Sequence, residues 1–97
     1  MRYEIVLSPQ AVADLRKMPA RRRTEVREQI EVHLRHEPSR TSRSRIKKLR
    51  GLSRPQYRLR VGDVRVFYDV TRDEVQILTI VTKEQALRWL QNAGGSP

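Results

Sequence analysis

The residues best suited to chemistry are three arginines in the segment from Tyr57 to Val70, which reads YRLRVGDVRVFYDV. Gly62-Asp63 separates two alternating runs, the pattern of a hairpin with a two-residue turn. In that register Arg60 lies directly opposite Arg65, and Arg58 falls on the same face. Because like charges in opposite positions destabilise a sheet, we interpret the pair as an anion site, to which guanidinium groups are well suited. A solvated face in an arginine-rich chain is the alternative interpretation.

A basic segment leads into this hairpin. No acidic residue occurs between Pro38 and Asp63. A segment with many basic and no acidic residues favours a binding track for the phosphate backbone of a nucleic acid over an ordinary solvated surface. The track contains Arg45, Lys47, Lys48 and Arg50.

Composition limits the class of protein. The 97 residues suffice for one domain, which we expect over residues 1–93 with a flexible tail at 94–97. The net charge of +10, mostly from arginine, implies a polyanionic partner, either nucleic acid or an acidic protein. The absence of cysteine, of a signal peptide and of a membrane span is consistent with the cytoplasm, and no basic helix suits a membrane surface. Metal ligands do not cluster, so we expect no metal and no cofactor.

Periodicity predicts the elements that must position these side chains. Ser8-Pro9 is a helix start, and Thr82 with Gln85 fits a capping box before a second one. Strands joined by tight turns form an antiparallel sheet with the helices packed on its apolar face, an α+β fold of order β-α-α-β-β-β-β-α. The predicted strands cover 2–7, a short stretch before Gly51, 57–61, 64–70 and 75–82, and the predicted helices cover 9–18, 20–36 and 83–91.

Two features of the helix over 20–36 need separate interpretation. Arg21, Arg22 and Arg23 lie in its first turn, where the helix dipole disfavours cations. They serve a partner or are tolerated in water, and the pattern does not choose between these. His33 and His36 lie near its end, where a C-terminal cap interaction is favoured over metal binding.

Three motifs together resemble the RelE/ParE superfamily of bacterial type II toxins, over almost the whole length. They are Lys48–Gly51 (KLRG), the hairpin, and Ile77–Ile80 (ILTI). The resemblance implies a cytoplasmic toxin with a cognate antitoxin, which a basic groove flanked by Phe67, Leu78 and Ile80 would accept as an acidic amphipathic chain. Members divide into ribosome-dependent mRNA endonucleases, which are RelE-like, and DNA gyrase poisons, which are ParE-like, on one scaffold.

The RelE-like branch implies roles for particular residues. The nuclease branch has a C-terminal tyrosine that this chain lacks; Trp89 could stack on a base but cannot transfer a phenolic proton. A crowded Lys47 or Lys48 is a candidate proton acceptor. The implied catalytic residues are Arg58, Arg60, Arg65 and Lys83, and the implied RNA-binding residues are Arg45, Lys47, Lys48, Arg50 and Trp89.

Three hypotheses therefore stand. The first is a metal-independent endoribonuclease that cuts mRNA on the ribosome and so inhibits translation. The second is a ParE-like inhibitor of DNA gyrase. The third is a non-catalytic protein of the toxin fold, retained as a partner of its antitoxin or as a DNA-bound co-repressor.

Overall fold

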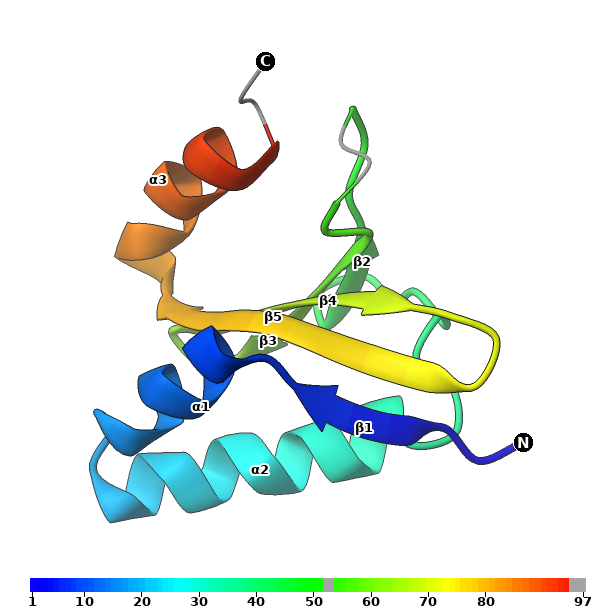
Figure 1. Cartoon of the computed structure of the whole chain (residues 1–97), viewed down its shortest axis with the longest axis horizontal. Helices are drawn as coiled ribbons and strands as arrows, with labels where there is room; N and C mark the ends of the chain where they lie inside the picture. The colour runs from blue at the N-terminus through cyan, green and yellow to red at the C-terminus, as the bar shows by residue number, and fades with distance from the viewer. Residues whose placement is uncertain (52–53, 95–97) are drawn as a thin grey trace.

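The computed structural model describes residues 1–51 and 54–94, and it contains one sheet with helices on both of its faces (Figure 1). The predicted order of elements and the α+β class are confirmed. The flexible tail predicted at 94–97 falls, beyond Gly94, outside the described residues. The elements are β1 (Glu4–Leu7), α1 (Pro9–Arg16), α2 (Ala20–Leu34), β2 (Ile46–Lys48), β3 (Tyr57–Val61), β4 (Val64–Val70), β5 (Glu74–Thr82) and α3 (Lys83–Gly94).

The sheet is mixed rather than wholly antiparallel. Its strand order is β1-β5-β4-β3-β2, and β2 to β5 pair antiparallel. β1 pairs parallel to β5, with Glu4 opposite Glu74 and Leu7 opposite Ile77. The antiparallel sheet was predicted because tight turns join neighbouring strands. That reasoning does not apply to β1, because two helices and three strands separate β1 from β5 along the chain.

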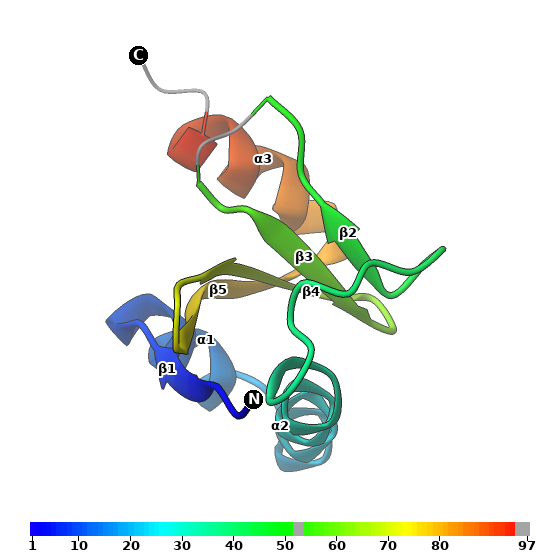
Figure 2. The ribbon, with the colours of Figure 1, turned by 90° about the vertical axis from the view of Figure 1, so that its right-hand side faces the viewer.

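The helices divide between the two faces of the sheet, which differs from the expectation of one covered face. Figure 2 shows α1 and α2 on one side and α3 on the other. The first side holds the core, where side chains such as Leu59, Val66 and Ile77 meet Leu15 and Ile30 of the helices. α3 covers the opposite face, so part of that face is shielded from water as well.

Both predicted helix starts are present. The Ser8 hydroxyl accepts a hydrogen bond from the Ala11 N–H (3.0 Å) and donates one to the Leu78 carbonyl (2.7 Å), which ties α1 to β5. At α3, the Gln85 N–H donates to Thr82 Oγ (3.3 Å), and the Thr82 N–H donates to Gln85 Oε1 (3.2 Å). This reciprocal pair is the capping box expected from the sequence.

Two of the three arginines at the start of α2 have partners within the fold. Arg22 forms an ion pair with Asp63 in the hairpin turn. Arg23 donates from Nε to the Leu15 carbonyl (3.1 Å) and from Nη2 to the Met18 carbonyl (3.0 Å), which satisfies acceptors at the end of α1. Tertiary contacts therefore account for both side chains.

The histidines near the end of α2 do not cap its last carbonyls. His33 Nε2 is bonded to the Gln29 side chain (2.9 Å), and His36 Nδ1 approaches the Met1 carbonyl (3.3 Å). In residues 1–51 and 54–94, no three His, Cys, Asp or Glu side chains group as metal ligands. Across the same ranges, every helix is too short or too polar to cross a bilayer.

Candidate functional site

The β3–β4 hairpin has the register predicted from the sequence. Tyr57 pairs with Tyr68, Arg58 with Phe67, and Arg60 with Arg65. Gly62 opens the two-residue turn with a φ of 59°, in the left-handed region that favours glycine. The turn therefore places two guanidinium groups side by side on one face of the sheet.

We call Lys47, Arg58, Arg60 and Arg65 the arginine face. Lys47 joins the three arginines because it pairs with Arg58 across the β2–β3 ladder, and opposed residues project from the same side. Among the described residues, none of the four forms an ion pair with a carboxylate. The face therefore carries uncompensated positive charge.

The two acidic residues of the hairpin, Asp63 and Asp69, are already engaged. Asp63 is paired with Arg22, and the contact lowers the pKa of its carboxyl group. Asp69 is buried and accepts from Arg54 Nε (2.6 Å) and from the Gln56 N–H (2.8 Å). The charge of Asp63 still acts on Arg65, whose pKa it raises in part, but neither carboxylate forms an ion pair with an arginine of the face.

The charge on two of these arginines is partly withdrawn from water. Arg65 is only 7% exposed, and its Nη1 donates to the carbonyls of Gly62 (2.8 Å) and Val64 (3.1 Å). Burial, and then the charge of Arg60, lowers the pKa of Arg65. Burial, and then the charges of Arg65 and Arg60, lowers the pKa of Arg58. The lowered pKa values mean that burial and mutual repulsion both disfavour the charged forms of Arg58 and Arg65 in the folded protein.

One donor on the arginine face has no partner. Arg58 Nη2 donates to the Ser44 carbonyl (3.1 Å), but Arg58 Nε is buried and makes no hydrogen bond to any described residue. A buried donor left without an acceptor costs free energy, and an anion bound at this face would supply the negative charge that offsets part of the cost of holding the cations together. The arrangement is therefore suited to holding a phosphate group.

An aromatic pair borders the arginine face. Trp89 of α3 stacks on Phe67, with ring centroids 5.1 Å apart and planes inclined by 13°. Beyond this pair, Arg54, Pro55, Leu78 and Trp89 line a pocket of about 270 Å³. An apolar, partly aromatic recess thus adjoins the cations, the combination that single-stranded nucleic acids bind.

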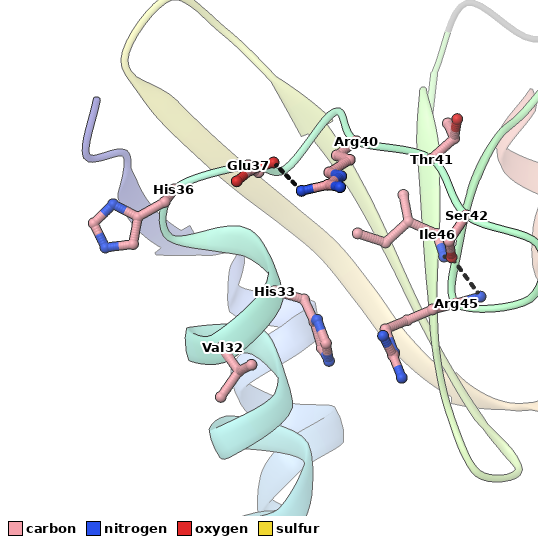
Figure 3. A pocket seen from close by; sticks show the side chains of 9 residues that line it. All are labelled: Val32, His33, His36, Glu37, Arg40, Thr41, Ser42, Arg45 and Ile46. Atoms are coloured by element: carbon pink, nitrogen blue, oxygen red, sulfur yellow. Dashed lines mark hydrogen bonds and ion pairs between the residues drawn. The ribbon is translucent and has the colours of Figure 1, made fainter.

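The remaining residues proposed from the sequence are dispersed. Lys83 begins α3 beside the hairpin turn, where its N–H donates to the Asp63 carbonyl (2.6 Å). Lys48 pairs with Tyr57, so it projects from the other face of the sheet than Lys47. Arg45 lines a separate cavity against α2, seen in Figure 3, and Arg50 is an exposed residue beyond β2.

One residue expected beside the arginines is on the wrong side of the sheet. Ile80 was predicted to flank a groove with Phe67 and Leu78, but it is 2% exposed and pairs with Val66 in the core. The register of β5 against β4 shifts so that Leu78 has no partner. This bulge changes which residues share a face, and strict alternation could not anticipate it.

Sequence analysis did not identify Arg54 as part of this region. Its contact with Asp69 holds the segment that leads into β3, and Arg54 lines the same pocket as Trp89. The sequence did offer a signal for Arg54. Extending the hairpin register by one pair beyond Tyr57 and Tyr68 brings Gln56 opposite Asp69, so the carboxylate of Asp69 was predictable as a neighbour of the segment that contains Arg54.

The chain matches one protein family and several solved structures. Residues 5–87 match the family described as the ParE toxin of the type II toxin-antitoxin system, parDE. The RelBE2 toxin-antitoxin complex from Mycobacterium tuberculosis is similar with a TM-score of 0.70 and 27% identity, over 84% of this chain and 99% of that chain. The RelE–RelB complex from Pyrococcus horikoshii has a TM-score of 0.61 and 30% identity, over 86% and 97%.

A more distant structure shares the fold alone. The RelB–RelE complex from Methanococcus jannaschii has a TM-score of 0.63 at 22% identity, over 87% of this chain and 96% of that chain. No curated protein matches the chain. Since the family match covers most of the sequence, from the first strand into the last helix, the chain belongs to the ParE toxins of type II toxin-antitoxin systems, within the RelE/ParE superfamily.

Proposed function

We propose that this toxin binds RNA through the arginine face and cleaves mRNA on the ribosome. The supporting observation is the pair Arg60 and Arg65, held side by side with no carboxylate partner among the described residues. Phosphate groups are the anions that such paired guanidinium groups bind best. The resemblance to RelE structures favours RNA over other polyanions.

The chemistry proposed for this face is attack by a ribose 2′-OH on the adjacent phosphorus. The new P–O bond forms as the bond to the 5′ oxygen breaks, and the phosphorane carries extra negative charge that Arg58, Arg60 and Arg65 stabilise. Lys47, which pairs with Arg58, is the proposed acceptor of the 2′-OH proton. Lys83 follows the partner of Arg65 by two residues and is the proposed donor to the leaving oxygen.

Further contacts are proposed outside the reacting group. Trp89 would stack against a base, while Arg45, Lys48 and Arg50 would contact the backbone of mRNA or of ribosomal RNA. We also propose a cognate antitoxin as the partner in the cytoplasm, because the similar solved structures are toxin-antitoxin complexes.

Inhibition of DNA gyrase is the second candidate function. It is favoured by the engagement of both nearby carboxylates, Asp63 with Arg22 and Asp69 with Arg54. A toxin that binds a protein target needs no proton acceptor. The family description, which names ParE, is consistent with it.

The two candidates are separated by expressing the toxin in growing cells and mapping the 5′ ends of mRNA. We expect new ends inside translated codons, and cleavage of a short mRNA by the purified toxin only when ribosomes are present. Arg60→Gln should abolish the new ends, whereas Arg27→Gln, which removes an exposed charge from α2, should not. DNA breaks and filamentation without new mRNA ends would instead support gyrase as the target.

A further inference from the structure

The ion pair between Arg22 and Asp63 lies at the end of the arginine face, although neither residue belongs to it. Arg22 is in the first turn of α2, where the helix dipole disfavours a cation. Asp63 is the second residue of the β3–β4 turn and lies two positions before Arg65. The two paired side chains are 38% and 62% exposed, and an ion pair so exposed adds little to stability. Stability alone therefore does not account for this contact.

The ion pair draws the Asp63 carboxylate toward the helices that cover the core. α2 packs on the core side of the sheet (Figure 2), whereas Arg65 projects from the opposite side because its neighbour Val64 belongs to the core. Arg22 and Asp63 line one cavity of about 390 Å³ together with residues 17–19, which connect α1 to α2. The carboxylate is thus held away from the side of the sheet on which the arginine face lies.

The guanidinium group of Arg65 is fixed against the same turn. Its Nη1 carries two hydrogens, which are donated to the carbonyls on either side of Asp63, those of Gly62 (2.8 Å) and Val64 (3.1 Å). Within the described ranges, Nε and Nη2 of Arg65 donate to no protein acceptor, so they remain for an anion. The charge of Asp63 already acts on this group, because it opposes the lowering of the Arg65 pKa by burial and by Arg60. A carboxylate released from Arg22 would compete with a phosphate for the remaining donors of Arg65.

We propose that Arg22 is a positioning residue that keeps the arginine face open by holding the Asp63 carboxylate away from Arg65. Without Arg22, this carboxylate acts as an internal competitor for the anion that the arginines bind. The proposal rests on the function proposed above, in that the arginine face must bind an anion. It also gives a reason for a cation in the first turn of α2, where the helix dipole opposes it.

The test measures the affinity of purified toxin variants for inorganic phosphate, by nuclear magnetic resonance titration, and for a short single-stranded RNA, by fluorescence anisotropy. Both are measured at constant ionic strength. Arg22→Gln releases the Asp63 carboxylate, so we expect both affinities to fall by about tenfold, the effect of losing one charge-assisted contact. Arg22→Lys keeps the ion pair and should bind within about threefold of the unaltered toxin.

The second substitution distinguishes a competitor from a simple support of the turn. Adding Asp63→Asn to Arg22→Gln removes the competitor and should restore both affinities to within about threefold of the unaltered toxin. Asp63→Asn alone should bind at least as well as the unaltered toxin. The turn keeps its positive φ at Gly62 and the contact of the residue 63 carbonyl with the Lys83 N–H in this variant.

Matched controls separate this effect from a change in net charge. Arg21→Gln removes the same charge one position earlier, where no described carboxylate forms an ion pair, and should change phosphate affinity by less than about threefold. Asp73→Asn removes a negative charge at an exposed position beyond the other end of β4. Added to Arg22→Gln, it should not restore binding.

Three results would overturn the proposal. They are equal losses in Arg22→Gln and Asp63→Asn, which would mean that the ion pair only supports the turn, unchanged phosphate affinity in Arg22→Gln, and failure of the double variant to regain affinity. The proposed function fails separately. If phosphate binding follows the expected order but the unaltered toxin leaves mRNA intact on ribosomes, the role of Arg22 is upheld and the anion is not mRNA.

Discussion

Arg60 and Arg65 oppose one another across the β3–β4 hairpin, where a hairpin selected only for stability would carry at most one of them. Arg58 adds a third charge, with a buried Nε that has no partner among the described residues. The lowered pKa values of Arg58 and Arg65 report the same conflict, since burial and mutual repulsion both oppose their charged forms. A bound anion would reduce this conflict, which is the reason for proposing that these residues bind RNA.

Stability and toxicity should therefore respond in opposite directions to one substitution. Arg60 is exposed and opposite Arg65, so Arg60→Gln removes a like-charge pair and should raise the free energy of unfolding by about 0.2–1 kcal/mol. The same change should weaken RNA binding by about tenfold, because a charge-assisted hydrogen bond is lost. Urea unfolding and RNA binding measure the two effects. A less stable variant that stays toxic would contradict this account.

Among the elements, the β3–β4 hairpin is the one that brings the arginines together, and two contacts and one backbone angle hold its turn. The Asp63 carboxylate is paired with Arg22 at the start of α2, and the Asp63 carbonyl accepts from the Lys83 N–H (2.6 Å) at the start of α3. Gly62 supplies the positive φ that closes the turn in two residues. The turn is thus fastened to helices on both sides of the sheet, which limits how far the arginines can move.

The conformational role of Gly62 can be isolated by substitution. A Cβ atom at this position would meet nothing within 4 Å, so any cost of Gly62→Ala comes from its φ of 59° rather than from a clash. We expect a loss of about 1–2 kcal/mol in the free energy of unfolding. Gly62→Asn, which tolerates the left-handed region better, should lose less. Equal losses for the two variants in urea unfolding would mean that the backbone angle is not the cause.

At the scale of the whole molecule, the net charge of +10 gives the toxin a strong general attraction to polyanions. Two areas of that charge differ in kind. The arginine face presents closely spaced guanidinium groups beside an aromatic pair, whereas the cavity beside α2 combines Arg45 with the imidazole rings of His33 and His36. The first arrangement fits nucleic acid, which is the class of partner proposed for this face.

Anion binding should be visible as thermal stabilisation. Inorganic phosphate that binds the folded arginine face raises the free energy of unfolding by about 1.4 kcal/mol when its concentration is tenfold above the dissociation constant. The melting temperature should therefore rise in phosphate relative to chloride at equal ionic strength. Arg60→Gln should reduce the rise, and Arg27→Gln should not. An identical rise in both variants would indicate a general salt effect.

Local patterns in the chain were sufficient for much of this structure. Ser8-Pro9 and Thr82 with Gln85 start helices because capping depends on residues within one turn. Gly62-Asp63 determines the pairing of Arg60 with Arg65 because a two-residue turn leaves a single register. In each case the interacting groups are close along the chain.

Long-range packing decided the rest. The parallel pairing of β1 with β5 and the position of α3 opposite α1 and α2 depend on segments far apart along the chain. The bulge at Leu78 turned Ile80 into the core, and the cavity beside α2 formed between a helix and a segment without periodicity. Short-range periodicity carries no information about which distant surface an element will meet, so these features, and with them the neighbours of each basic side chain, emerged only once the chain was folded.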